Sequence, residues 1–125
     1  RGPFVQGRAV IAVANLHAIN FTLGLAEYRG QIDAVVRALE LHAGPIVVAG
    51  DFNNWSAART AAMHEAMARL GLQAVTPSLD GRARVFGQPI DHLFVRGLVV
   101  LDARAPASSA SDHNPLLVTL RLAPR

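Results

Sequence analysis

Runs of apolar residues alternate with an amphipathic stretch along the first part of the chain. Residues 9–14 and 46–49 are continuously apolar, which is typical of strands that are buried on both faces. Between them, apolar residues recur at helical spacing over residues 25–41, and Gly44-Pro45 supplies a stop. The pattern predicts two buried strands joined by a long amphipathic helix.

A second helix and then strands alone follow. Ser56 can cap a helix that runs to about residue 70 and is closed by Gly71. After residues 72–75 the pattern changes, and apolar runs predict four strands, at residues 83–86, 90–95, 98–102 and 116–122. Asp80-Gly81 predicts a turn, and residues 103–110 predict a flexible loop. In the last strand the residues of one face are all apolar: Leu116, Val118, Leu120 and Leu122. The order of elements predicts an α/β layer in which helices cover one face of a sheet.

Composition narrows the function classes only in part. The chain has 125 residues, of which 51% are hydrophobic and 17% charged, so a single globular domain is expected. Its net charge of +3 is modest and does not by itself indicate a nucleic-acid groove. The absence of cysteine excludes disulfides, thiolate zinc sites and cysteine nucleophiles. With no long apolar run and no signal peptide at its start, the sequence predicts a cytoplasmic chain without a membrane segment.

Two polar clusters lie where apolar runs meet loops, Gly50-Asp51-Phe52-Asn53 and Ser111-Asp112-His113. Carboxylate and amide oxygens are the ligands that a hard divalent cation such as Mg²⁺ prefers, and Asp51, Asn53 and Asp112 supply such a set. Cleavage of a phosphate ester requires an activated water and neutralised phosphoryl charge, which a metal and its ligands provide. The clusters therefore indicate a metal-assisted phosphate-cleaving site.

Each piece also has a plain structural interpretation. Asp51 and Asn53 would point to the same side of an extended segment, but an Asp-x-Asn turn that bonds its own backbone is an open alternative. His113 can bind phosphate or act as a base with Asp91 as its orienting partner, although such a pair is often only a surface hydrogen bond. His17 would emerge beside Asp51 if the first two strands are parallel neighbours. Convergence of all these residues at one sheet edge is harder to explain by structure alone.

Four motifs in order resemble those of the magnesium-dependent endonuclease/exonuclease/phosphatase superfamily. They are Asn15-Leu16-His17, Gly50-Asp51-Phe52-Asn53, Ile90-Asp91-His92 and Ser111-Asp112-His113-Asn114-Pro115. Residues 15–21, 50–56 and 86–91 look most like the bacterial YafD-like branch. The resemblance covers most of the chain. It implies one half of a DNase I-like α/β sandwich, with a mixed, largely antiparallel sheet and two helices on its outer face.

The resemblance implies distinct roles for the catalytic residues. Asp51 matches the aspartate that orients or deprotonates the attacking water, and Asn53 the asparagine that holds the scissile phosphate near the metal. His113 matches the histidine that contacts the phosphate, and Asp91 the carboxylate that fixes it. His17 matches a histidine that contacts the phosphate or helps to protonate the leaving oxygen.

The remaining candidates lie around this set. Asp112 matches a carboxylate at or beside the metal, which in this family is Mg²⁺ or Mn²⁺ as one or two ions. Asn15 is a candidate on the substrate side. Trp55 could stack on a base or sugar, or could equally anchor its loop. Arg82 is expected to be solvated, and His92 is expected to face away from the site.

The family's first half has no counterpart here, including an early asparagine and the glutamate that is its principal metal ligand. Residues 1–125 are therefore predicted to be a C-terminal half, holding the second of two sheets and inactive alone. The missing half or a second copy of the chain would cover the apolar sheet face. The implied reaction is in-line attack of an activated water on a phosphate ester, more often a diester, in a nucleic acid, inositol phosphate or lipid head group. Two alternatives stay open: an inactive sandwich that binds protein, lipid or nucleic acid, and a small fold whose clusters are coincidental turns.

Overall fold

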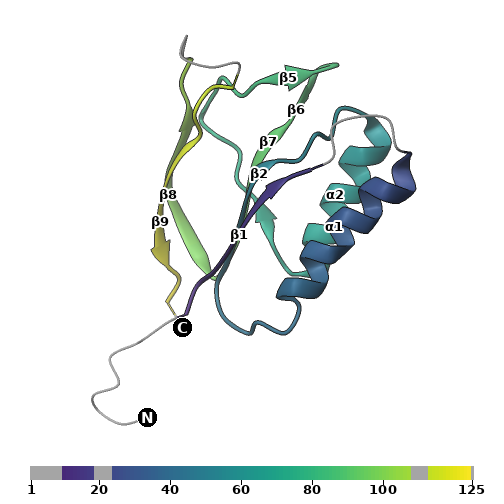
Figure 1. Ribbon diagram of the computed structural model, residues 1–125. Helices are drawn as coiled ribbons and strands as arrows, with labels where there is room; N and C mark the ends of the chain where they lie inside the picture. Colours follow the sequence, from purple (N-terminus) through teal and green to yellow (C-terminus); the bar gives the residue numbers. More distant parts are fainter. Residues whose placement is uncertain (1–9, 19–23, 108–112, 125) are drawn as a thin grey trace, which may run out of the picture.

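The computed structural model describes residues 10–18, 24–107 and 113–124, and these form three layers (Figure 1). The middle layer, here called the central sheet, has the strand order β1-β2-β7-β3. Its strands are β1 (Ala12–His17), β2 (Ile46–Asp51), β7 (Asp91–Arg96) and β3 (Gln73–Ala74). The helices α1 (Leu25–Leu39) and α2 (Ala57–Arg69) lie on one side of it. On the other side lies the outer sheet, formed by β4 (Leu79–Asp80), β8 (Leu98–Ala105) and β9 (Leu117–Leu122).

Pairing in these sheets is mixed and mostly antiparallel. In the central sheet β1 runs parallel to β2, whereas β7 is antiparallel to both β2 and β3. In the outer sheet β4 is parallel to β8 and β9 is antiparallel to it. A separate two-stranded hairpin joins β5 (Arg84–Val85) to β6 (Gln88–Pro89) just before β7. The expected α/β class, with two helices over a mixed sheet, is therefore confirmed.

Local signals set the ends of both helices. The Ser56 side chain accepts a hydrogen bond from the backbone N–H of Arg59 at 3.1 Å and so caps α2. At its other end Gly71 has φ +71°, the left-handed conformation that glycine adopts at low cost. Helix α1 ends at Leu39, two residues earlier than predicted, and Leu41 beyond it is 95% exposed. Neither helix is long and apolar enough to cross a membrane, and this holds for every helix in the described ranges.

The helices and the central sheet enclose the larger of two hydrophobic cores. The helices contribute residues spaced one turn apart, among them Tyr28, Ile32 and Met63, and the sheet contributes Ile46 and Val48. All five side chains are at most 1% exposed. Complete burial of an aliphatic side chain of this size stabilises a fold by about 1.5–3 kcal/mol. This core fixes β2, the strand that ends at Asp51.

The second core lies between the two sheets. It is made by Val75, Val95 and Ala103, with partly buried side chains packed against it: Val47, Leu93, Leu98, Val118 and Leu120. Val118 and Leu120 belong to the predicted apolar face of the last strand, and this part of the prediction is confirmed. The expectation that the chain holds only one sheet is wrong, because β8 and β9 leave the central sheet and pack against it. Gly97, at φ +72° between β7 and β8, turns the chain at this point.

Two boundaries also differ from the sequence prediction. Residues 103–105 belong to β8, where they pair with β9 and β4, rather than to a loop. Strand β1 begins at Ala12 and is not buried on both faces, since Val13 is 70% exposed. The described part of the outer sheet packs on β2 and β7, which leaves Val13 on β1 uncovered.

A buried histidine links β7 to the first core. His92 is 7% exposed and packs against the rings of Phe52 and Phe94, on the opposite face of β7 from Asp91, as predicted. Its Nε2 lies 3.0 Å from Asn54 Oδ1 and 2.8 Å from Pro89 O, so this nitrogen carries the hydrogen. Nδ1 lies 3.4 Å from the Arg82 guanidinium and accepts. Burial, together with that cation, lowers the pKa of His92 to about 4.

We therefore expect a loss of stability in mild acid. An unfolded His92 takes up a proton below its ordinary pKa of 6.5, whereas the folded one stays neutral until pH about 4. The free energy of unfolding should fall by about 3 kcal/mol as the pH drops from 6.5 to 4. Urea unfolding at pH 7 and pH 4.5 measures this, with His92→Gln as the comparison. The variant should be less stable at pH 7 but should lose this pH dependence, and an equal slope in both proteins would contradict the assignment.

Candidate functional site

Backbone pairing places three predicted site residues in one row across the central sheet. His17 at the end of β1 is the register partner of Asp51 at the end of β2, and Asp51 is the partner of Asp91 at the start of β7. The predicted parallel pairing of β1 and β2 is confirmed. Asp51 shares a face of β2 with Val47 of the second core, so the row faces the side of the outer sheet.

His113 joins this row from the other sheet. It lies four residues before β9, and its Nδ1 is 2.6 Å from Asp91 Oδ2. An ionised carboxylate can only accept, so Nδ1 is the donor and Nε2 is the nitrogen that lies 3.8 Å from Asp51 Oδ2. Asp51 and Asp91 have side chains that are 18% and 17% exposed, whereas that of His113 is 43% exposed. One potential ligand atom from each residue falls within a group less than 4.8 Å across.

The loop after β2 turns sharply at Asn53. The backbone N–H of Asn53 donates to Asp51 Oδ1 at 2.9 Å, and Asn53 has φ +44°. The Asp-x-Asn turn, which the sequence left open, is therefore formed, and the expectation of an extended segment is wrong. A side-chain hydrogen bond to the backbone stabilises the turn and makes the left-handed conformation tolerable for asparagine. The other carboxylate oxygen of Asp51 still lies on the side of His113.

Four consecutive carbonyl groups, those of residues 51–54, each accept a hydrogen bond, and the donors come from α1, from α2 and from the residue after β1. In chain order the donors are Ala18 N at 2.9 Å, Tyr28 Oη at 2.8 Å, Arg59 Nη1 at 3.2 Å and Thr60 Oγ1 at 2.9 Å. Burial raises the pKa of the Tyr28 hydroxyl above its ordinary value of 10, so it remains a donor at neutral pH. Both helices therefore hold the loop that carries Asp51.

Arg82 is buried, and the expectation that it is solvated is wrong. Its side chain is 7% exposed and forms two 2.7 Å hydrogen bonds to the Asp80 carboxylate. These bonds and the charge of Arg82 lower the pKa of Asp80 to about 2. Arg82 Nη1 also donates to the backbone oxygen of Asp91 at 3.2 Å. The sequence offered no signal for this role, since the bond from Arg82 to Asp91 forms only when the segment after β4 meets β7.

The segment 80–82, here called the clamp, also holds the second half of the site. The Asn114 side chain donates to the backbone oxygen of Gly81, and the Gly81 N–H donates to Ala105 O at 2.8 Å. A Cβ atom at Gly81 would lie 2.5 Å from Ala105 O, so no larger residue fits without movement. The clamp thus contacts Asp91 on the central sheet and the residue that follows His113. It therefore links the segment that carries Asp91 to the segment that carries His113.

The other predicted residues lie at the edges of the site or outside the described ranges. Asn15 is exposed on β1, on the same face as His17 and two residues before it. The Asn53 side chain is almost fully buried and donates from Nδ2 to Ala18 O at 2.6 Å. Trp55 is partly buried, with the Arg59 guanidinium 4.6 Å above its ring. Asp112 lies outside the described residues, so its predicted metal role stays a prediction.

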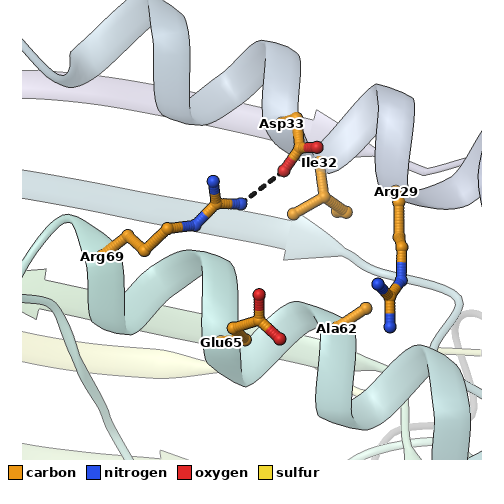
Figure 2. Close-up of a pocket in the computed structure, with 6 residues that line it drawn as sticks. All are labelled: Arg29, Ile32, Asp33, Ala62, Glu65 and Arg69. Atoms are coloured by element: carbon orange, nitrogen blue, oxygen red, sulfur yellow. Dashed lines mark hydrogen bonds and ion pairs between the residues drawn. The ribbon is translucent and has the colours of Figure 1, made fainter.

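A separate cleft of about 110 Å³ lies between α1 and α2 on the helical side of the molecule (Figure 2). Arg69 and Asp33 form an ion pair across it, and Arg29 and Glu65 line it as well. Its two basic and two acidic side chains balance, so it presents no net charge to a ligand. The central sheet separates it from the face on which Asp51 lies.

Known proteins resemble this chain over most of its length. The model of the Endonuclease/Exonuclease/phosphatase family matches residues 2–113. A UPF0294 protein from Vibrio campbellii is 51% identical over 113 residues, which are 90% of this chain and 40% of that protein. A UPF0294 protein from Yersinia enterocolitica is 45% identical over 93% of this chain and 44% of its own length. The chain therefore spans less than half the length of these curated relatives. Their names identify no branch, so the YafD-like assignment stays a prediction.

Two solved structures share the fold. The human nocturnin catalytic domain with bound sulfate has a TM-score of 0.60 and 20% identity, over 90% of this chain and 46% of its own. An endonuclease/exonuclease/phosphatase from Bacteroides vulgatus has a TM-score of 0.59 and 24% identity, over 86% of this chain and 47% of its own. These likenesses confirm the predicted DNase I-like α/β architecture.

The two arginines on Asp80 should contribute very differently to stability. We expect Arg82→Ala to lower the free energy of unfolding by about 1–3 kcal/mol, because it removes a buried guanidinium and leaves the partly buried Asp80 carboxylate without its main partner. Arg84 contacts the same carboxylate at 3.4 Å, but its side chain is 46% exposed. Arg84→Ala should therefore cost less than about 0.5 kcal/mol. Urea unfolding of the two variants tests the clamp, and similar losses in both would refute it.

Proposed function

Because the chain belongs to the endonuclease/exonuclease/phosphatase family, we propose that it carries the water-orienting and phosphate-contacting part of a divalent-metal-dependent hydrolase of phosphate esters, with diesters preferred. The observation that carries the proposal is the arrangement of His113, held by Asp91 through Nδ1 while Nε2 lies 3.8 Å from Asp51. A base and a phosphate-binding group on either side of one small space suit attack on a phosphate ester.

The 3.8 Å separation has a chemical use. A single oxygen about 2.8 Å from each group can hydrogen-bond to both the Asp51 carboxylate and the His113 ring. Asp51 then orients the attacking water and accepts its proton. His113, when protonated, donates from Nε2 to a phosphoryl oxygen, and the Asp91 carboxylate offsets its positive charge. His17, the register partner of Asp51, lies on the side where it can contact the phosphate or the leaving oxygen.

The donor set fits a hard divalent cation, Mg²⁺ or Mn²⁺, as one or two ions. Asp51 and Asp91 offer carboxylate oxygens beside His113, within the same small group of atoms. Asp91 is hydrogen-bonded to His113, so Asp51 is the better ligand of the two, together with Asp112 and the Asn53 amide oxygen. When bound, the ion neutralises charge on the phosphoryl oxygens. The principal carboxylate ligand, a glutamate, is proposed to come from the part of the full-length protein outside this chain.

The proposal is tested by hydrolysis of 4-nitrophenyl phosphate esters, as diester and monoester, by the full-length protein with Mg²⁺ or with EDTA. We expect Asp51→Asn and His113→Ala each to lower kcat by about 10²–10⁴-fold, because each removes a proton-transfer or phosphate-binding group. Asp102→Asn is the matched control, since Asp102 is an exposed aspartate of the outer sheet. It should retain full activity. Unchanged rates in both site variants, or full activity in EDTA, would refute the proposal.

The isolated chain should be nearly inactive. Val13 on β1 is exposed, and the proposed glutamate is not among residues 1–125. We expect the remainder of the full-length protein, or a second copy of the chain, to cover this face and complete the metal site. Isothermal titration with Mg²⁺ and the same ester assay compare residues 1–125 with the full-length protein. Equal turnover in both would show that no outside carboxylate is needed.

A further inference from the structure

An exposed aromatic residue occupies a strained position close to the site. Phe86 is 85% exposed, and it is one of two non-glycine residues in the described ranges with positive φ, at +51°. Phe86 and Gly87, at φ +80°, are the two turn residues of the β5–β6 hairpin, and two positive φ values define a type I′ turn. Asparagine, aspartate or glycine is preferred at the first position of such a turn. An exposed phenylalanine there disfavours both the turn and solubility.

The ring of Phe86 lies beside a second aromatic residue. Its centroid is 6.2 Å from that of Trp55, with the two planes at 66°. The Arg59 guanidinium lies between Trp55 and Tyr28, 4.6 Å from each ring centroid, and so supports the Trp55 ring. This packing orients Trp55 but buries little of Phe86. Packing alone therefore does not explain the choice of residue at position 86.

Chain connections place both rings near the site. Trp55 follows Asp51 by four residues and Phe86 precedes Asp91 by five, so the backbone of neither can lie more than about 18 Å from that of its aspartate. Arg84 donates to the Gly87 carbonyl within the hairpin, and it also contacts Asp80 of the clamp at 3.4 Å. Figure 1 shows the hairpin standing at the end of the central sheet where β2 ends and β7 begins. The hairpin that carries Phe86 therefore stands at the end of the central sheet that carries Asp51 and Asp91.

We propose that Phe86 and Trp55 form a stacking platform for an unpaired base of a single-stranded nucleic acid whose phosphodiester occupies the Asp51–His113 site. The proposal rests on the proposed function and names its substrate class. A flat ring on a rigid turn stacks on any base, because every base has a π-face. The neighbouring Arg84, 46% exposed, adds positive charge for the backbone phosphates. Bases in a duplex are already paired and stacked on each other, so a single strand offers a base to the platform at a lower free-energy cost.

Binding without turnover tests the platform in the full-length protein. Fluorescence anisotropy in EDTA compares a labelled oligothymidylate with an abasic oligomer of equal length and charge. Wild type should bind the oligothymidylate more tightly. Phe86→Ala should weaken that binding by about 5- to 100-fold and leave the abasic oligomer unaffected. Phe86→Trp should keep the preference, and an oligouridylate arm shows whether DNA and RNA are bound alike.

Phe86→Asn separates binding from folding. Asparagine suits the first position of a type I′ turn, so this variant should melt at the same or a higher temperature while losing base-dependent binding as Phe86→Ala does. A large fall in melting temperature would instead show that Phe86 is a structural residue and would overturn the proposal.

Other results would also overturn it. The stacking proposal is refuted if wild type binds the base-bearing and abasic oligomers with equal affinity, or binds neither. Loss of binding to anionic phospholipid vesicles in Phe86→Ala, with oligonucleotide binding unchanged, would assign Phe86 to a membrane surface instead. The ester assay keeps the two proposals distinguishable. Base-dependent binding without any ester hydrolysis would sink the proposed function and leave the platform, whereas hydrolysis without base dependence would do the reverse.

Discussion

The site depends on the backbone register of β2 with both of its neighbours. Because His17, Asp51 and Asp91 are register partners, a slip of one residue in either pairing would send an aspartate or the histidine to the helical face. Gly50 holds this register. It has φ +141°, and a Cβ atom there would lie 2.0 Å from the Leu16 carbonyl oxygen. Only glycine lets β1 and β2 approach closely enough for His17 to stand beside Asp51.

The first core and the site are connected through the loop that follows β2. Buried groups on both helices bind its carbonyls, with Tyr28 from α1 and Arg59 and Thr60 from α2. A charged guanidinium is costly to bury, and here two aromatic faces and a carbonyl oxygen surround it. Helix packing therefore determines where the Asp51 carboxylate lies. Substitutions in the helical core can reach the site by this route without touching it.

Local patterns in the sequence predicted the structural features that depend on residues close together in the chain. The cap at Ser56, the stop at Gly71 and the apolar face of β9 were readable because each depends on residues close in sequence. The convergence of Asp51, Asp91 and His113 followed from motif order and is present. Arg82 could not be foreseen, since its burial depends on Asp80 and Asp91 from different sheets. The second sheet was missed because the pairing of β8 with β4 and β9 joins residues that are far apart in the sequence, and the turn at Gly97 gives no sign of it.

The two hydrophobic cores lie on opposite faces of the central sheet, and they hold different parts of the candidate site. The first core holds His17, Asp51 and Asp91 in place from the helical side, and it does not include β8 or β9. His113 depends on the smaller second core, which the β8–β9 hairpin shares with the central sheet. Cooperative units with fewer buried contacts open at lower free energy than the rest of a fold. Detachment of β8 and β9 would therefore separate His113 from Asp51 and Asp91 while the helical half stays folded, so that the geometry of the candidate site is less stable than the molecule that carries it.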